Sequence, residues 1–119
     1  MEKIVFLPGA SGNIDFWKPL IEFLPKKYEK QIIGYPGFGR IAEDTRLKSF
    51  SDLQEYVTGK INSESILIAQ SMGGIFAVNK AFTDASLIKG LVLIATSGGI
   101  DLTPFNVQDW RTEYQEQYP

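Results

Sequence analysis

The sequence predicts an α/β fold in which helices cover both faces of a parallel sheet of about four strands. Three runs, at residues 3–7, 65–69 and 91–95, are continuously apolar instead of alternating, as strands covered on both faces are. A weaker run lies at 30–35. Helical patterns fill the intervals, so strand and helix alternate along the chain. This alternation favours a three-layer domain with right-handed crossovers.

The interval after the first strand predicts a helix over residues 16–24, with Asp15 placed to cap it. Apolar side chains recur there on one helical face, as in a helix that packs on a core. We expect this face to lie against the sheet, and it comprises Phe16, Leu20, Phe23 and Leu24.

Two further helices are predicted on either side of the strand at 65–69. The first begins near a possible capping box of Ser51 and Gln54. Its apolar residues follow a three- and four-residue spacing and are Phe50, Leu53, Val57 and Ile61. The second covers residues 72–82, and its apolar positions are Ile75, Val78 and Phe82.

The composition is that of an ordinary globular domain, with 119 residues, 44% hydrophobic, 22% charged and a net charge of −2. No cluster of lysine or arginine suggests nucleic acid or an anionic membrane as partner. The first apolar run is too short for a signal peptide or a membrane span, so a cytoplasmic location is expected. The chain has no cysteine, which excludes disulfides, thiolate nucleophiles and Cys-ligated zinc. We expect no metal and no cofactor.

The sequence contains no histidine. Histidine is the usual general base near neutral pH and the commonest metal ligand. Its absence excludes Ser-His and Cys-His mechanisms that rely on these 119 residues alone.

The turn after the strand at 65–69 has the composition of a catalytic turn. A serine stands between the end of an apolar strand and a glycine pair that opens a helix, in the sequence Ala69-Gln70-Ser71-Met72-Gly73-Gly74. Small residues two positions before and after a serine permit a very tight turn, which lifts a strained serine hydroxyl clear of the sheet. The alternatives are a structural strand-to-helix turn, or one that cradles a phosphate.

Three other segments accompany this turn in order: F-L-P-G-A-S-G-N after the first strand, G-Y-P-G-F-G after the weak strand, and L-V-L-I-A-T-S-G-G. Together they resemble the serine-nucleophile branch of the α/β-hydrolase superfamily. The resemblance implies that Ser71 is the nucleophile and that Met72 and Ala10 donate the oxyanion N–H groups. Pro8-Gly9 then occupies a loop that often begins with histidine, and Tyr35 stands where aspartate is frequent.

The same resemblance implies a flavodoxin-like strand order of second, first, third, fourth. Residues 1–99 would be the N-terminal half of the hydrolase core, and residues 100–119 the start of a truncated lid or cap. The strand at 91–95 then becomes an apolar edge, so we expect self-association through it or through an exchanged tail. Within 100–119, an aromatic stripe with the spacing of a helix face comprises Trp110, Tyr114 and Tyr118.

In this superfamily the acid and then the histidine follow the serine, which places the base outside these residues. Asp101 is a candidate acid, with a loop or helix-start residue as the alternative. The resemblance implies a small-molecule ester or acyl substrate, an acyl-serine intermediate and no cofactor. It also implies that these residues by themselves are inactive.

Two other functions remain open. The first loop resembles the glycine-rich NAD(P) turn of atypical short-chain dehydrogenases at Gly9 and Gly12, with Asp15 in place of the third glycine. Tyr56 and Lys60 have the Tyr-x-x-x-Lys spacing of those enzymes but lie far too early in the chain. The second alternative is a binding module that uses the hydrolase fold without its triad.

Overall fold

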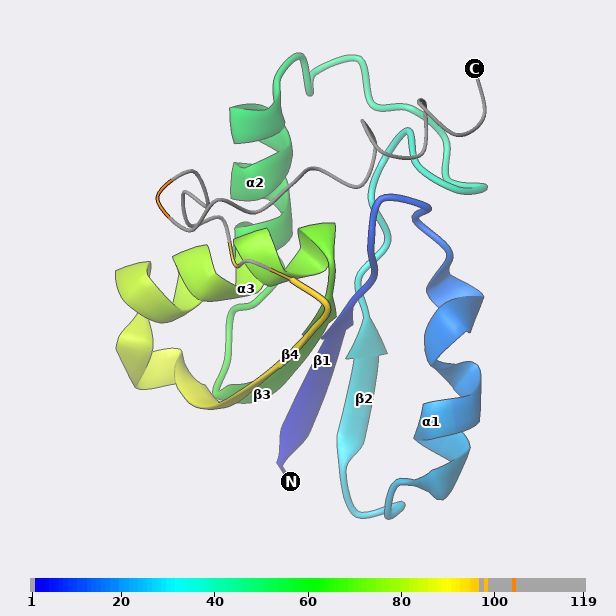
Figure 1. Ribbon diagram of the computed structural model, residues 1–119, viewed down its shortest axis with the longest axis vertical. Coiled ribbons are helices and arrows are strands. Elements are labelled where there is room, and N and C mark those ends of the chain that lie inside the picture. The colour runs from blue at the N-terminus through cyan, green and yellow to red at the C-terminus, as the bar shows by residue number, and fades with distance from the viewer. Residues whose placement is uncertain (1, 97, 99–103, 105–119) are drawn as a thin grey trace.

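The computed structural model describes residues 2–96, 98 and 104, and within them the sheet is fully parallel with the strand order β2-β1-β3-β4. The order and the parallel pairing confirm the prediction. Helix α1 covers one face of the sheet, and α2 and α3 cover the other, which gives the expected three layers (Figure 1). The four strands are β1 (Lys3–Leu7), β2 (Glu29–Ile32), β3 (Ser65–Gln70) and β4 (Ile88–Ile94).

The strand boundaries differ from the predicted ones at β2 and β4. β4 begins at Ile88, three residues earlier than expected. The charged Lys89 and the glycine at position 90 belong to the strand, although neither is typical of a buried apolar strand. β2 ends at Ile32, although the Ile33 N–H still donates to the Phe6 carbonyl oxygen at 3.0 Å. The chain then leaves the sheet through a loop in which Gly37 has φ +86°, a conformation that favours glycine.

Alternate residues of β1 point to opposite faces and so divide the core in two. Val5 and Leu7 belong to a cluster shared with α2 and α3, and Ile4 and Phe6 belong to a smaller cluster under α1. Because β1 is central, both clusters meet the same strand. The loop that follows β1 is therefore attached to the best-buried part of the molecule.

The prediction of which face of the first helix packs on the core is wrong. A 3-10 turn at Ile14–Trp17 precedes the short helix α1 (Lys18–Phe23), and Asn13, not Asp15, is the cap, since its side chain accepts the Asp15 N–H. The indole of Trp17 is buried against Phe6, with ring centroids 5.4 Å apart. The inward stripe therefore follows Trp17 at four- and seven-residue steps and comprises Trp17, Ile21 and Leu24. Of the predicted face, only Leu24 packs on the core, and the exposed members are Phe16, Leu20 and Phe23.

Helix α2 (Phe50–Gly59) begins two residues earlier than a cap at Ser51 would start it. Ser49 is the cap: its hydroxyl accepts the Asp52 N–H at 3.1 Å, and the Asp52 carboxylate accepts the Lys48 N–H at 2.8 Å. The expected pairing of Ser51 with Gln54 is thus wrong. The predicted core positions Leu53, Val57 and Ile61 are buried, whereas Phe50 is half exposed and stacks on Phe76.

Helix α3 (Met72–Thr83) buries a different face from the predicted one. Its buried residues are Gly73, Gly74, Phe76 and Ala77, and Phe82 is 85% exposed. The glycines face inward because the start of the helix lies directly on the ends of neighbouring strands. A short 3-10 turn, Ala85–Leu87, joins α3 to β4.

Several predictions fall on residues that the structure does not describe. Asp101 and the aromatic stripe of Trp110, Tyr114 and Tyr118 lie outside the described residues, as does nearly all of the predicted lid. Within the described part of the chain, no helix is long and apolar enough to cross a membrane.

Candidate active site

Ser71 is the single residue between β3 and α3, and its backbone has φ 51° and ψ −119°. A non-glycine residue in such a conformation costs about 1–3 kcal/mol and persists only when its surroundings enforce it. Two backbone hydrogen bonds do so here: the Ser71 N–H donates to the Ile94 carbonyl at 3.0 Å, and the Gly74 N–H donates to the Ser71 carbonyl at 3.0 Å. The side chain is exposed and does not cap α3. The turn therefore presents an exposed hydroxyl at the carboxyl end of the sheet.

The glycines after the serine are required by close contacts. A Cβ on Gly73 would overlap the carbonyl oxygen of Leu7 and come within 2.6 Å of that of Pro8. A Cβ on Gly74 would overlap the hydroxyl oxygen of Thr96. The neighbours of Gly73 thus belong to the end of β1, while Ala69, the predicted small residue on the other side of the turn, is fully buried.

The predicted oxyanion loop lies beside the serine. A Cβ on Gly9 would come 3.3 Å from the Ser71 Cβ and 2.9 Å from the Gln70 amide oxygen. Ala10 is exposed, and the Gly12 N–H closes the loop by donating to the Gly9 carbonyl at 3.0 Å.

The two predicted oxyanion donors are the backbone N–H groups of Ala10 and Met72. Among the described residues, neither the Ala10 N–H nor the Met72 N–H donates to a partner outside its own element. The Met72 N–H is also at the first turn of α3, where the helix dipole favours negative charge.

Tyr35 is a residue of this region whose contacts the sequence did not indicate. Its hydroxyl donates to the Pro8 carbonyl at 2.6 Å, and the whole side chain is buried. Its ring makes edge contacts with Phe38 at 6.0 Å and Phe76 at 5.3 Å between centroids. Burial raises the pKa of Tyr35 above its ordinary value, so the hydroxyl remains a donor. The one sign of it in the sequence was that tyrosine stands at position 35, where the α/β-hydrolases that the sequence resembles often have aspartate.

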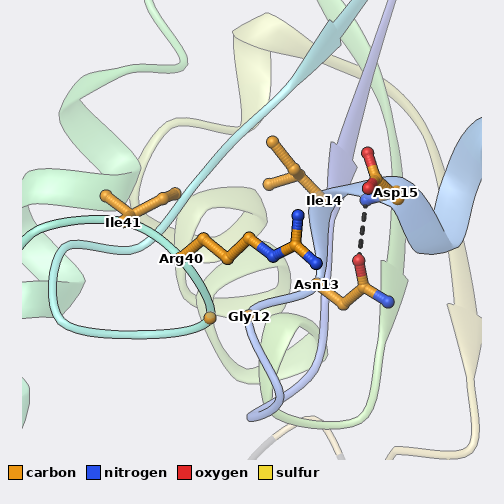
Figure 2. Close-up of a pocket in the computed structure, with 7 residues that line it drawn as sticks. Gly12, Asn13, Ile14, Asp15, Arg40 and Ile41 are labelled. Atoms are coloured by element: carbon orange, nitrogen blue, oxygen red, sulfur yellow. Dashed lines mark hydrogen bonds between the residues drawn. The ribbon is translucent and has the colours of Figure 1, made fainter.

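A cavity of about 540 Å³ lies next to the predicted oxyanion loop, between the segment that follows β1 and the segment that follows β2 (Figure 2). The Arg40 side chain extends across it toward Asn13, whose side chain accepts the Asp15 N–H at 3.0 Å. The cavity has a volume typical of small-molecule sites, but Ser71 does not line it. Its lining residues are Gly12, Asn13, Ile14, Asp15, Gly39, Arg40 and Ile41.

The features of the dehydrogenase alternative do not come together in the described residues. The Asp15 carboxylate at the start of the first helical turn pairs with Lys18 at 2.8 Å, and this pairing lowers its pKa, so a negative charge stands where a pyrophosphate would bind. Lys60 lies 5.0 Å from the centre of the Tyr56 ring, at the far end of α2. In the described part of the chain, no group of three or more His, Cys, Asp or Glu side chains could hold a metal ion.

Comparison with known proteins points to one family. A protein-family model described as the alpha/beta hydrolase family matches residues 4–118 of this chain. The chain is 30% identical over 95 residues to the pimeloyl-[acyl-carrier protein] methyl ester esterase of Wigglesworthia glossinidia brevipalpis, covering 80% of this chain and 36% of that protein. It is 27% identical over 94 residues to the protein of the same name from Yersinia pestis, covering 79% and 36%. The chain therefore spans just over a third of the length of these relatives.

Solved structures show the same fold at lower identity. An extracellular alpha/beta-hydrolase from a Paenibacillus species has a TM-score of 0.73 at 16% identity, covering 98% of this chain and 50% of that one. Polyneuridine aldehyde esterase has a TM-score of 0.69 at 17% identity, covering 100% and 49%. Both similarities concern the fold alone.

Proposed function

The chain belongs to the alpha/beta hydrolase family, and from that premise we propose that Ser71 is the nucleophile of a carboxylic-ester hydrolase. The observation that carries the proposal is the conformation of Ser71. Its φ of 51° between β3 and α3 leaves the hydroxyl exposed and without a capping bond. A structural serine at a helix start ordinarily caps the helix instead.

In the proposed reaction, the Ser71 Oγ attacks the ester carbonyl while a base takes its proton. The carbonyl oxygen becomes an oxyanion, which accepts hydrogen bonds from the Ala10 and Met72 N–H groups. The C–O bond to the alcohol then breaks, the alcohol leaves with the proton, and an acyl-serine remains for water to hydrolyse. Each oxyanion donor contributes about 2.7–4 kcal/mol of transition-state stabilisation.

The base comes from outside these residues, because the sequence contains no histidine. Loss of a triad histidine costs about 10⁶ in turnover in a serine protease, so residues 1–119 by themselves are inactive in this proposal. Asp101 stays a candidate for the acid, and residues 100–119 for the start of a lid over the site.

The names of the relatives suggest the substrate class. Both relatives described above are methyl ester esterases that act on an acyl group linked to a carrier protein. We propose a methyl or other small alkyl ester of an acyl chain as substrate, without a cofactor. The cytoplasmic location and self-association, through β4 or through an exchanged tail, remain predictions.

The test uses the full-length protein that contains this chain. Fluorophosphonate should label the wild type at one serine, and pimeloyl-carrier methyl ester or a p-nitrophenyl ester should be hydrolysed. Ser71→Ala should abolish labelling and turnover, while Ser86→Ala, at an exposed serine of the turn after α3, should preserve both. Labelling that survives Ser71→Ala would contradict the proposal. Absence of labelling in the wild type would favour the binding module, and retention of NAD(P)H on gel filtration would favour the dehydrogenase.

A further inference from the structure

The hydroxyl of Tyr35 reaches the loop that carries one of the two proposed oxyanion donors. It donates to the Pro8 carbonyl oxygen at 2.6 Å, and both residues are buried. Pro8 has no N–H, so this carbonyl is its only backbone hydrogen-bonding group. The two residues are 27 positions apart, and the bond joins the segment after β1 to the segment after β2.

The direction of the Ala10 N–H depends on two consecutive peptide planes. In the plane between Gly9 and Ala10, the Gly9 carbonyl accepts the Gly12 N–H at 3.0 Å. The N–H of a trans peptide points opposite to its carbonyl, so this bond sets the direction of the Ala10 N–H. In the preceding plane the Pro8 carbonyl is held by Tyr35. Together the two bonds fix the loop from Pro8 to Ala10.

The ring of Tyr35 packs on α3, the helix that carries the second proposed donor, Met72. It packs on Phe76, which lies one turn beyond Met72 on α3, with centroids 5.3 Å apart. Phe38 also makes an edge contact with this ring, with centroids 6.0 Å apart. Tyr35 thus contacts the oxyanion loop through its hydroxyl and the first turns of the serine helix through its ring.

The loop is also confined where it meets the segment after β2. A Cβ on Gly12 would come 2.8 Å from the Gly39 nitrogen, and one on Gly39 would come 2.7 Å from the Gly12 carbonyl oxygen. These contacts fix the far end of the loop at Gly12. The near end at Pro8 has the Tyr35 hydroxyl as its polar anchor.

We propose that Tyr35 is a positioning residue of the oxyanion hole, which holds the Pro8–Gly9 peptide so that the Ala10 N–H points at the developing oxyanion. This inference rests on the proposed function of Ser71. Tyr35 acts through Pro8 and touches no substrate. Its effect therefore belongs to the transition state and not to substrate binding.

The test is Tyr35→Phe in the full-length enzyme, since it removes the hydroxyl and keeps the ring. Turnover is expressed per active site, counted by fluorophosphonate titration, so that unfolded protein does not count. We expect kcat per titrated site to fall about tenfold or more, short of the ~10²–10³ loss of one whole donor, with KM unchanged. A trifluoromethyl ketone, which adds to the serine and forms an oxyanion, should bind more weakly by the same factor as the loss in kcat/KM.

The matched control is Tyr56→Phe, at a half-buried tyrosine that packs on the same core cluster. It should leave kcat and ketone affinity unchanged. If Tyr35→Phe yields too little folded protein, 4-fluorophenylalanine at position 35 fills the space of the hydroxyl without donating, and the same loss is expected.

Two outcomes separate this inference from the function on which it rests. If either Tyr35 variant keeps kcat per titrated site and ketone affinity within twofold of the wild type, while Ser71→Ala is inactive, Tyr35 does not position the loop and the function stands. If Ser71→Ala keeps its turnover, the proposed function itself fails, and the Tyr35 inference fails with it.

Discussion

The backbone of Gly73 lies against the carbonyl oxygen of Leu7, so closely that a Cβ would overlap that oxygen. Leu7 ends β1, and Gly73 is the second residue of α3. The contact therefore joins the serine turn to the central strand of the sheet. It also sets the distance between the two segments that carry the proposed oxyanion donors.

Gly73→Ala should destabilise the protein, because its new methyl group meets backbone atoms that cannot rotate away. Overpacking of this kind costs about 1–3 kcal/mol in the free energy of unfolding, measured by urea titration. Gly59→Ala is the control, since a Cβ there has nothing within 4 Å and the residue lies at the end of α2. The control should be neutral or stabilise by up to ~1 kcal/mol. Equal effects of the two substitutions would contradict the proposed role of the Leu7 contact.

Ser49→Ala should lower the free energy of unfolding by about 1 kcal/mol, because it leaves the Asp52 N–H at the start of α2 without its acceptor. Ser51→Ala should change it by less than ~0.5 kcal/mol, as expected for an exposed position without a cap. Thermal or urea unfolding of both variants decides between the two caps. A larger loss for Ser51→Ala would place the cap where the sequence suggested it.

These two serines show why helix details were harder to predict than strands. Both Ser49 and Ser51 have a suitable acceptor three residues later, Asp52 and Gln54, so the pattern fits either cap. The choice depends on how Leu53 and Val57 meet the sheet, which is a tertiary contact. The strands were predictable because buried parallel strands are apolar throughout, whichever neighbours they have.

The candidate site divides in the same way. The strained turn at Ser71 was predictable because a tight strand-to-helix turn requires small residues at fixed spacing, which is a local property. The bond from Tyr35 to Pro8 was not, because it joins residues 27 positions apart and depends on where two loops leave the sheet. At the first helix, Phe16 and Trp17 are both large and apolar. Only the packing of Trp17 against Phe6 shows which one is inside.

The carboxyl group of Asp44 should titrate with a pKa of about 2, because it accepts hydrogen bonds from the side chain of Arg46 and from the backbone N–H of Arg46. A lowered pKa adds stability above the unfolded-state value of about 3.9, and this contribution is lost as the pH falls through about 2. Carbon-13 NMR of the carboxyl group measures the pKa directly.

Arg46→Gln should raise the pKa of Asp44 toward its ordinary value, because the side-chain hydrogen bond from the Arg46 guanidinium is the main cause of the lowered pKa. Lys48→Gln is the control and should leave it unchanged, because Lys48 does not contribute to the shift. An Asp44 pKa near 4 in the wild type would show that the pair does not form in solution.

The 119-residue chain should self-associate through β4. Among the described strands, β4 pairs only with β3, so its other edge has no strand beside it. Four consecutive apolar side chains of β4 are also exposed, and they are Leu91, Val92, Leu93 and Ile94. An exposed apolar edge offers unpaired backbone groups to a second chain, and a charged side chain on the edge opposes that pairing. Leu93→Lys should therefore weaken association in sedimentation velocity at least tenfold, about 1.4 kcal/mol. Phe82→Lys removes an equally exposed apolar side chain from α3, away from the edge, and should leave association intact. A chain that stays monomeric at all concentrations, or equal weakening by both variants, would exclude β4 as the interface.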